Sequence, residues 1–241
     1  MNPPKTVAIA RSPLFEGVDP QTVSAIAGAL TGETWPKGLQ IMGPAESAQR
    51  FHLVVAGRVK ISRSNSRDGR DLTLWLLGPG DGFDIVSLLD GEPHAVTAWA
   101  LDDVRTLSGP MPLWREWLER YPTLRLAAHR YVAEKLRELG ELAADLALHD
   151  TSTRVANLLL RNFDAKGDNL LRDLPQRELA SMIGSVRIVV SRALAQMRRQ
   201  GVIELHGGAI RAVDLKRLLA SADAELARRR AVSRASKVGT R

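Results

Sequence analysis

The sequence lacks cysteine entirely across its 241 residues. Disulfide bonds, thiolate chemistry and cysteine-ligated zinc or iron–sulfur sites are therefore excluded. It also lacks any run of about 18 apolar residues, the length that a membrane-spanning helix requires. Residues 1–12 hold two prolines and two basic residues but no apolar segment of a secretory signal. We expect a cytoplasmic protein with no membrane partner.

A recognisable catalytic constellation is missing as well. No serine, histidine and aspartate set stands near glycines, no loop has the spacing that cradles phosphates, and no paired carboxylates mark one site. The five histidines, at positions 52, 94, 129, 149 and 206, show no metal-ligand spacing. The sequence therefore favours a binding protein, and an enzyme is left only if distant positions cluster in space.

The positive charge is concentrated in the last third of the chain. Residues 1–149 contain 16 Lys and Arg against 18 Asp and Glu, whereas residues 150–241 contain 18 against 9. A basic segment attracts polyanions, and phosphate backbones are the commonest of these. Six of the basic residues fall within residues 228–241, so a solvated tail is the alternative explanation for part of the excess.

Between residues 33 and 109, short apolar segments alternate with glycine, proline and aspartate, and no helical period is visible. The segments are LQIM, FHLVV, GRVKIS, LTLWLL, AVTAWAL and VRTLS. Runs of about five residues are typical of strands joined by tight turns. We predict that residues 1–109 form a small antiparallel β-roll with a short N-terminal helix, which Asp19 caps and Pro20 begins.

Residues 110–149 have the apolar spacing of one long helix. A narrow seam recurs at steps of three and four residues and consists of Leu124, Ala128, Val132, Leu136, Leu139, Ala143 and Leu146. Two helices that pack as a coiled coil need such a seam, so we predict a homodimer formed through this helix. A helix lying on its own roll would show a similar stripe, which is the alternative.

Residues 150–228 have the element order of a winged helix-turn-helix, and a basic tail follows at residues 229–241. The predicted elements are a helix from Asp150 to about Phe163, a break at 164–168, helices at 175–183 and 185–200 around Gly184, strands at 202–205 and 209–213 joined by Gly207-Gly208, and a terminal amphipathic helix. The whole chain is therefore predicted to be an α+β protein.

The two helices around Gly184 carry the predicted function. Their shared core consists of Leu179, Ile183, Val189, Val190, Leu194 and Met197. The DNA-binding residues are then Gln176 in the first helix and, on the opposite face of the second, Ser185, Arg187, Ile188, Ser191 and Arg192. A helix fits the major groove, where arginine can donate two hydrogen bonds to guanine, so Arg187 and Arg192 are the predicted base readers of double-stranded DNA. Surface charges on an ordinary helical hairpin are the alternative.

At this point the sequence resembles a known family. Residues 146–213, beginning Leu-Ala-Leu-His-Asp-Thr-Ser-Thr-Arg-Val-Ala, resemble the hinge and winged-helix domain of the CRP/FNR regulators. Residues 14–145 resemble their cyclic-nucleotide-binding-like β-roll and dimerisation helix, with Val55-Ala56-Gly57-Arg58-Val59 and Thr97-Ala98-Trp99 among the marks. The resemblance implies a transcription regulator that binds a palindromic operator as a homodimer and contacts RNA polymerase.

The sequence departs from the cAMP-binding members of that family at the effector pocket. Those members hold the cyclic phosphate with an arginine, where this chain has Val96, and the ribose with a glutamate, near Val86 here. Leu139 and Gly140 stand where cAMP binders place Thr and Ser against the adenine. A buried phosphate without a cationic partner is strongly disfavoured, so we predict no physiological cAMP binding. The candidate effector pocket consists of Val86, Ser87, Val96, Thr97, Leu139 and Gly140.

The identity of an effector stays open. The alternatives are equal: haem ligated by His52 or His94, a cyclic dinucleotide, another cyclic nucleotide, or no effector at all.

The sequence also departs from the family in the second helix of the helix-turn-helix. Ile188 occupies the position of an acidic residue that pairs with cytosine in well-known relatives. An apolar side chain can contact a thymine methyl instead. An architectural protein that coats DNA with little sequence preference, using residues 228–241, is the competing function.

Overall fold

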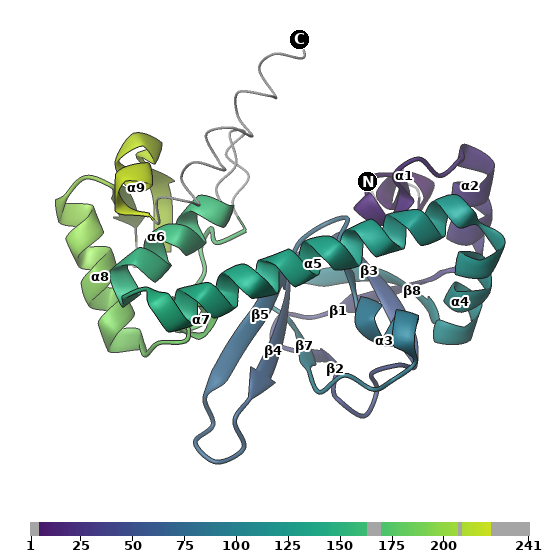
Figure 1. The fold of residues 1–241 in the computed structure, drawn as a ribbon, viewed down its shortest axis with the longest axis horizontal. Coiled ribbons are helices and arrows are strands. Elements are labelled where there is room, and N and C mark those ends of the chain that lie inside the picture. Colours follow the sequence, from purple (N-terminus) through teal and green to yellow (C-terminus); the bar gives the residue numbers. More distant parts are fainter. Residues whose placement is uncertain (1–4, 163–169, 207–208, 223–241) are drawn as a thin grey trace, which may run out of the picture. The chain divides into compact units, whose positions relative to one another are not determined.

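The computed structural model describes residues 5–162, 170–206 and 209–222 (Figure 1). These residues form two compact units: residues up to 69 with 74–139, and residues 70–73 with those from 140 onward. The first unit contains a β-roll and the second a helix-turn-helix, and a long helix joins them in sequence. The predicted α+β class is therefore confirmed.

The roll consists, within the described part of the chain, of two four-stranded sheets. Its strands are β1 (Thr31–Trp35), β2 (Gln40–Met42), β3 (Arg50–Ala56), β4 (Val59–Ser64), β5 (Asp71–Leu77), β6 (Gly82–Phe83), β7 (Thr97–Ala100) and β8 (Val104–Pro110). The first sheet has the order β1-β8-β3-β6 and the second the order β2-β7-β4-β5. Antiparallel ladders join neighbours, as where Leu53 of β3 pairs with Leu107 of β8.

Three elements of the roll escape the sequence prediction. β1 pairs along β8 but is mostly polar, β6 has two residues, and α3 (Ile85–Asp90) is a helix. The expectation of no helix between residues 33 and 109 is therefore wrong, because six residues are too few to display a 3.6-residue period. α3 is bounded by left-handed backbone at both ends, with φ of 69° at Asp84 and 87° at Gly91.

The N-terminal helix begins where the sequence predicts. Asp19 accepts a hydrogen bond from the Thr22 N–H at 2.9 Å, and Pro20 is the first residue of α2 (Pro20–Ala29). This hydrogen bond lowers the pKa of the Asp19 carboxyl, as expected when a donor stabilises the ionised form. Two short helices, the α-helix α1 (Lys5–Ala10) and the 3-10 helix η1 (Pro13–Phe15), precede α2.

The single helix predicted for residues 110–149 is in fact two helices (Figure 1). α4 (Met111–Arg120) ends at Tyr121, which has an extended backbone, and α5 (Pro122–Leu148) begins at the next residue. A proline disfavours helical angles in the residue before it and is itself well suited to the first turn of a helix. The chain therefore changes direction at Pro122, and α4 packs against α3, β3 and β8.

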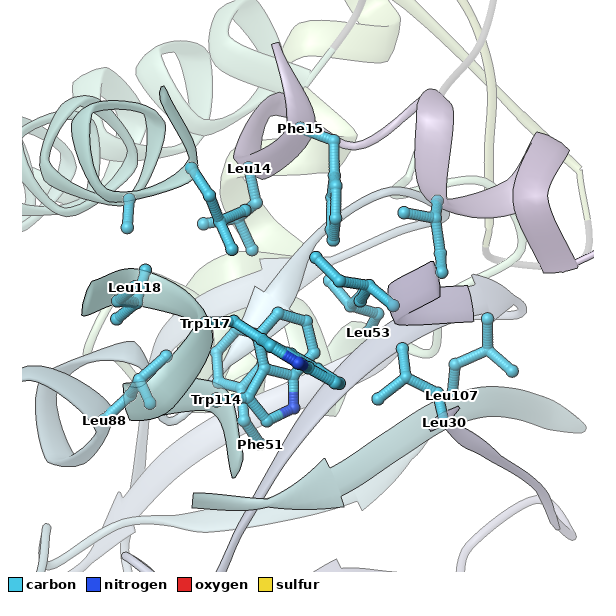
Figure 2. Packing of buried hydrophobic residues seen from close by; sticks show 14 of the residues in the cluster. Leu14, Phe15, Leu30, Phe51, Leu53, Leu88, Leu107, Trp114, Trp117 and Leu118 are labelled. Carbon is cyan, nitrogen blue, oxygen red and sulfur yellow. The ribbon is translucent and has the colours of Figure 1, made fainter. Parts of the chain in front are cut away.

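Trp114 of α4 is central to the apolar core of the N-terminal unit, and Figure 2 shows its neighbours. The ring is 1% exposed and stands edge-on to Phe51 and Trp117, with centroids 4.8 and 5.1 Å away. Phe15 adds a third edge contact at 6.2 Å. Residues from η1, β3 and α4 thus meet around one side chain, which ties η1 to the first sheet.

The apolar seam of α5 divides between two environments. Leu124 and Ala128 are buried in the core around Trp114, and Val132 packs against that core. Leu136, by contrast, is 69% exposed. The first half of the stripe therefore packs on its own roll, as the alternative interpretation predicts, whereas Leu136 remains available to a partner.

The C-terminal unit has the predicted order of elements. They are α6 (Thr151–Asn162), α7 (Gln176–Met182), α8 (Arg187–Arg199), β9 (Ile203–His206), β10 (Ala209–Val213) and α9 (Leu215–Ser221). α6 packs against α8 and α9, and α7 packs against α8. Asp150 accepts a hydrogen bond from the Thr153 N–H at 2.8 Å, which starts α6 and lowers the pKa of its carboxyl. The predicted break after Phe163, the Gly207-Gly208 turn and the basic tail lie outside the described residues.

A buried carboxylate holds α6 to the end of α5. Asp145 is 4% exposed, and its oxygens accept hydrogen bonds from Asn157 Nδ2 at 2.7 Å and from Arg161. His149 Nδ1 lies 3.1 Å from the same carboxylate. Because a buried charge is tolerated only when it is paired and hydrogen-bonded, these partners keep the two helices together.

We predict that Trp114→Ala lowers the free energy of unfolding by about 3–5 kcal/mol, because it opens a cavity in the middle of the core. Chemical denaturation followed by far-ultraviolet circular dichroism measures the loss. Leu39→Ala is the matched control, since Leu39 lies in the same unit but is 47% exposed. Its effect should stay within about 0.5 kcal/mol. Equal losses in the two variants would show that Trp114 is not central to this core.

Candidate functional site

The turn between α7 and α8 is shaped by Gly184. Its φ of 60° lies in the left-handed region, and a Cβ at this position would stand 2.5 Å from Leu146 Cδ2. The Ser185 N–H donates to the Ala180 carbonyl at 3.0 Å, which closes the turn. Glycine meets both requirements, since it adopts positive φ without strain and has no Cβ. The sequence prediction of a turn here is confirmed.

The buried face of the two helices agrees with the prediction at five positions of six. Leu179, Ile183, Val190, Leu194 and Met197 are each 4% exposed or less. Val189, which was expected in the shared core, is instead 37% exposed. It lies about 100° around the helix axis from Val190, which takes the buried position, so its side chain points away from the core.

The opposite face of α8 is open and bears most of the predicted DNA-binding residues. Arg187, Ile188, Ser191 and Arg192 are all exposed, Ser185 is half-buried, and Gln176 lies half-buried at the start of α7. The spacing of Arg187 to Ser191 and of Ile188 to Arg192 is four residues, so each pair shares one side of the helix. α8 therefore presents guanidinium, hydroxyl and apolar groups together.

Further exposed residues on α8 were missed by the sequence reasoning. Gln196, Arg198 and Arg199 are exposed towards its C-terminal end. Gln196 stands four residues after Arg192, so the same spacing rule could have identified it. These groups extend the polar and basic character of the helix beyond the predicted set.

The predicted wing follows α8. β9 and β10 pair antiparallel, with Ile203 opposite Val213 and His206 opposite Ala209. Ile203 and Ile210 are buried, so the hairpin is packed against the unit and is not free in solvent. Asp214 then caps α9 by accepting hydrogen bonds from the backbone N–H groups of Lys216 and Arg217.

The N-terminal unit contains a small hollow, with a cavity volume of about 30 Å³, that is partly open to solvent. Side chains from β2, β4, β5, β6, α3 and α5 line it. Of the predicted effector-pocket residues, Val86 and Val96 are part of this lining. Ser87 is fully buried next to it and donates a hydrogen bond to Asp84 at 2.7 Å.

The other predicted pocket residues lie elsewhere. Thr97 pairs with Ser62 in the ladder between β7 and β4. Leu139 and Gly140 come after Lys135, which is the residue of α5 that lines the hollow. The lining residue Asp84 was not predicted, and no sequence signal distinguished it from the other acidic residues of the roll.

The two histidines considered as haem ligands differ in surroundings. His52 is 4% exposed and stacks on Phe83 with ring centroids 4.8 Å apart. Burial, aided by the nearby Arg50 guanidinium, lowers the pKa of His52 to about 4, even though Glu33 lies 3.5 Å from its Nδ1. His94 is half-buried and lines the hollow. Among residues 5–162, 170–206 and 209–222, no three His, Asp or Glu side chains are grouped as metal ligands.

None of the helices in the described segments combines the length and the apolar character needed to cross a bilayer.

Both units match known protein families. Residues 33–121 match the cyclic nucleotide-binding domain, and residues 153–221 match the Crp-like helix-turn-helix domain.

Whole-chain relatives agree with these matches. The chain is 32% identical over 216 residues to the CRP-like cAMP-activated global transcriptional regulator of Mycobacterium tuberculosis, covering 87% of this chain and 96% of the relative. It is 33% identical over 203 residues to the cyclic AMP receptor protein of Thermus thermophilus, covering 83% and 91%.

Among solved structures, FixK2 from Bradyrhizobium japonicum superimposes with a TM-score of 0.69 at 25% identity, covering 80% of this chain and 98% of that chain. The regulators of Mycobacterium tuberculosis and Thermus thermophilus are named for transcriptional control or for a signalling ligand and not for a reaction. With a β-roll, a long helix and a helix-turn-helix in the same order, the chain belongs to the CRP/FNR superfamily of transcription regulators.

Proposed function

We propose that this regulator binds a specific palindromic duplex as a homodimer, with α8 in the major groove. The division of α8 into two faces is the observation that carries the proposal. Val190 and Leu194 are fully buried against the rest of the unit, whereas Arg187 and Arg192 are exposed. A helix held in this way presents its polar face to a groove without losing its packing.

Arg187 and Arg192 are the proposed base readers. Each guanidinium can donate two hydrogen bonds to O6 and N7 of guanine, a pairing that distinguishes guanine from the other bases in the major groove. Ile188 is an apolar side chain of α8 and is 66% exposed. Contact with a thymine methyl would cover it. Ser185, Ser191 and Gln176 complete the proposed surface with groups that can bind phosphate or base edges.

The proposed homodimer is formed through α5. Leu136 belongs to the predicted seam and is 69% exposed. A second copy of the helix would remove this side chain from water, and two-fold symmetry would match that of a palindrome. Such a dimer would act in the cytoplasm through binding, with no catalytic step, and would influence transcription by contacting RNA polymerase.

We also propose that cAMP is not the physiological effector, although two relatives are named for it. Val86 and Val96 line the hollow at the positions that the family resemblance assigns to the cAMP-binding glutamate and arginine. A cyclic phosphate at Val96 would meet a side chain that can neither neutralise its charge nor donate hydrogen bonds.

The proposed specificity predicts a defined result when the purified protein selects from random duplex oligonucleotides. The recovered sequences should converge on a palindrome whose half-sites are separated by one helical turn, roughly 34–36 Å. High-throughput sequencing of the bound fraction provides the measurement. Recovery of unrelated sequences with equal affinity would instead indicate a protein that coats DNA.

Arg187→Ala should cost about 1–3 kcal/mol of binding to the selected site and relax the preference at one base position per half-site. Fluorescence anisotropy with the selected duplex and a scrambled duplex measures both effects. Arg130→Ala serves as the control, because Arg130 is exposed on α5 and lies outside the proposed surface. A loss of the same size on both duplexes would assign Arg187 to the phosphate backbone.

Leu136→Glu should convert the dimer into a monomer, because it places a carboxylate in the apolar seam. Sedimentation velocity measures the change in mass. Leu126→Glu is the matched control, since Leu126 is 49% exposed on the same helix but lies outside the seam. If both variants keep the mass of the parent protein, α5 does not form the dimer through Leu136.

A further inference from the structure

We propose that Asp145, Asn157 and Arg161, a buried cluster where α5 meets α6, set the separation of the two α8 helices in the dimer. This separation determines which spacing of half-sites the regulator accepts. The inference rests on the proposed dimeric DNA binding and deepens it, because it assigns positioning residues that lie outside the proposed DNA-contacting set. The short link between the helices, the geometry of the cluster and its connection to α8 support it.

The link between α5 and α6 consists of two residues. α5 ends at Leu148 and α6 begins at Thr151, so only His149 and Asp150 separate them. Each residue contributes two soft backbone dihedrals, and small rotations about them swing the whole of α6. Side-chain contacts between the two helices must therefore fix the angle between them.

The Asp145 cluster supplies these contacts from one face of each helix. On α6, Asn157 and Arg161 stand four residues apart, and both donate hydrogen bonds to the Asp145 carboxylate, with Asn157 Nδ2 at 2.7 Å. Arg161 Nη1 also lies 3.8 Å from Oε2 of Glu141, which precedes Asp145 by one turn of α5. Residues four apart share a helix face, so successive turns of α6 hold successive turns of α5. Two such attachments restrict a rotation that a single contact permits.

The polar chemistry of the cluster makes the angle specific. Asp145 is 4% exposed and Asn157 is 1% exposed, so little water can replace a partner that moves away. Hydrogen bonds depend strongly on distance and angle, and a buried carboxylate that loses its cationic partner is heavily penalised. Apolar side chains could slide past each other at a smaller cost. The cluster therefore selects one direction of α6 among those that the link allows.

α8 follows any movement of α6, because the two helices pack together. Arg154 of α6 also donates a hydrogen bond to the Ile183 carbonyl at 2.9 Å, beside the turn that precedes α8. Val190 and Leu194 anchor α8 from its own side, since both are fully buried. The angle between α5 and α6 thus becomes the position of α8.

The same turns of α5 belong to the proposed dimer seam. Ala143 and Leu146 are seam residues of the C-terminal unit, and Ala143 is exposed while Leu146 is 36% exposed. Asp145 stands between them in sequence but is buried against α6 of its own protomer. When two copies pair along the seam, the junction in each protomer fixes how far its α8 lies from the two-fold axis. The separation of the two α8 helices follows, and with it the spacing of the half-sites.

The separation of the two α8 helices can be measured without DNA. Because the chain has no cysteine, Arg199→Cys places one spin label per protomer at the exposed end of α8. Pulsed electron spin resonance on the labelled full-length dimer gives the distribution of distances between the labels. We expect one narrow distribution for the labelled parent protein and a broader one when Arg161→Met removes the cationic partner of Asp145.

Ile210→Ala is the matched control for this measurement. It truncates a side chain of β10 that is 1% exposed, so it lowers the stability of the same unit from outside the cluster. Its distance distribution should stay as narrow as that of the parent protein. Asn157→Leu is a second variant if Arg161→Met does not fold, because it removes one donor to Asp145 and keeps the ion pair with Arg161. A narrow distribution in the folded cluster variant, or equal broadening in Ile210→Ala, would overturn the inference.

Duplexes that differ only in the spacing of two half-sites extend the test to binding. One added base pair should weaken binding by the parent protein about 10-fold or more, because a displaced half-site loses at least as much as one mismatched base pair costs. Arg161→Met should reduce this difference to about 3-fold or less, since a loosened junction lets α8 reach both spacings. Binding to a single half-site should be the same in both proteins. Fluorescence anisotropy measures all three affinities.

The outcomes distinguish the inference from the proposed function. A parent protein that binds every duplex alike would overturn the proposed function and, with it, the assignment of spacing. A sharp spacing optimum that Arg161→Met retains would overturn the inference alone. A loss of affinity for the single half-site as large as that for the complete site would also overturn it, because the cluster would then support the fold of the unit and not the placement of α8.

Discussion

The buried carboxylate of Asp145 is the constraint on which the exposed face of α8 depends. Its oxygens accept hydrogen bonds from Asn157 and Arg161 of α6. Helices α8 and α9 in turn pack against α6. Arg154, also on α6, donates to the Ile183 carbonyl at 2.9 Å, next to the turn that starts α8. One helix thus holds the end of α5, the turn and α8. Removing Arg161 would leave the buried carboxylate without its arginine partner, and breaking a buried ion pair typically costs about 3–5 kcal/mol.

That support explains how α8 can expose apolar side chains and remain ordered. Val186 and Ile188 are 50% and 66% exposed at its beginning, where water contacts them unfavourably. The buried face of α8 offsets this cost by packing against the rest of the unit, through Val190, Ala193, Leu194 and Met197. The exposed face of α8 is therefore stabilised by the buried face of the same helix. Its exposed residues are not needed for folding and can serve recognition.

The N-terminal unit builds its fold and its hollow largely from the same buried residues. The family match over residues 33–121 reflects strands and turns that build the roll, and these depend on buried residues such as Phe51 and Val59. The hollow is lined partly by the same cores, since Ile85 belongs to the core with Phe51 and Val96 to the core with Val59, whereas Asp84 adds an acidic group. The shape of the hollow is therefore coupled to the fold, because residues that pack the roll also line this space.

Local chemistry was enough to predict the helix caps at Asp19 and Asp150 and the turn at Gly184, because each depends on neighbours a few residues away. The two-unit order, the helix-turn-helix and the exposed face of α8 follow from the same short-range periodicity. Only tertiary structure decided that Val189 is exposed, that α5 divides its seam between core and solvent, and that Asp145 is buried beside Asn157. Burial and partner choice are set by segments far apart in the chain, and no local pattern records which of them will meet.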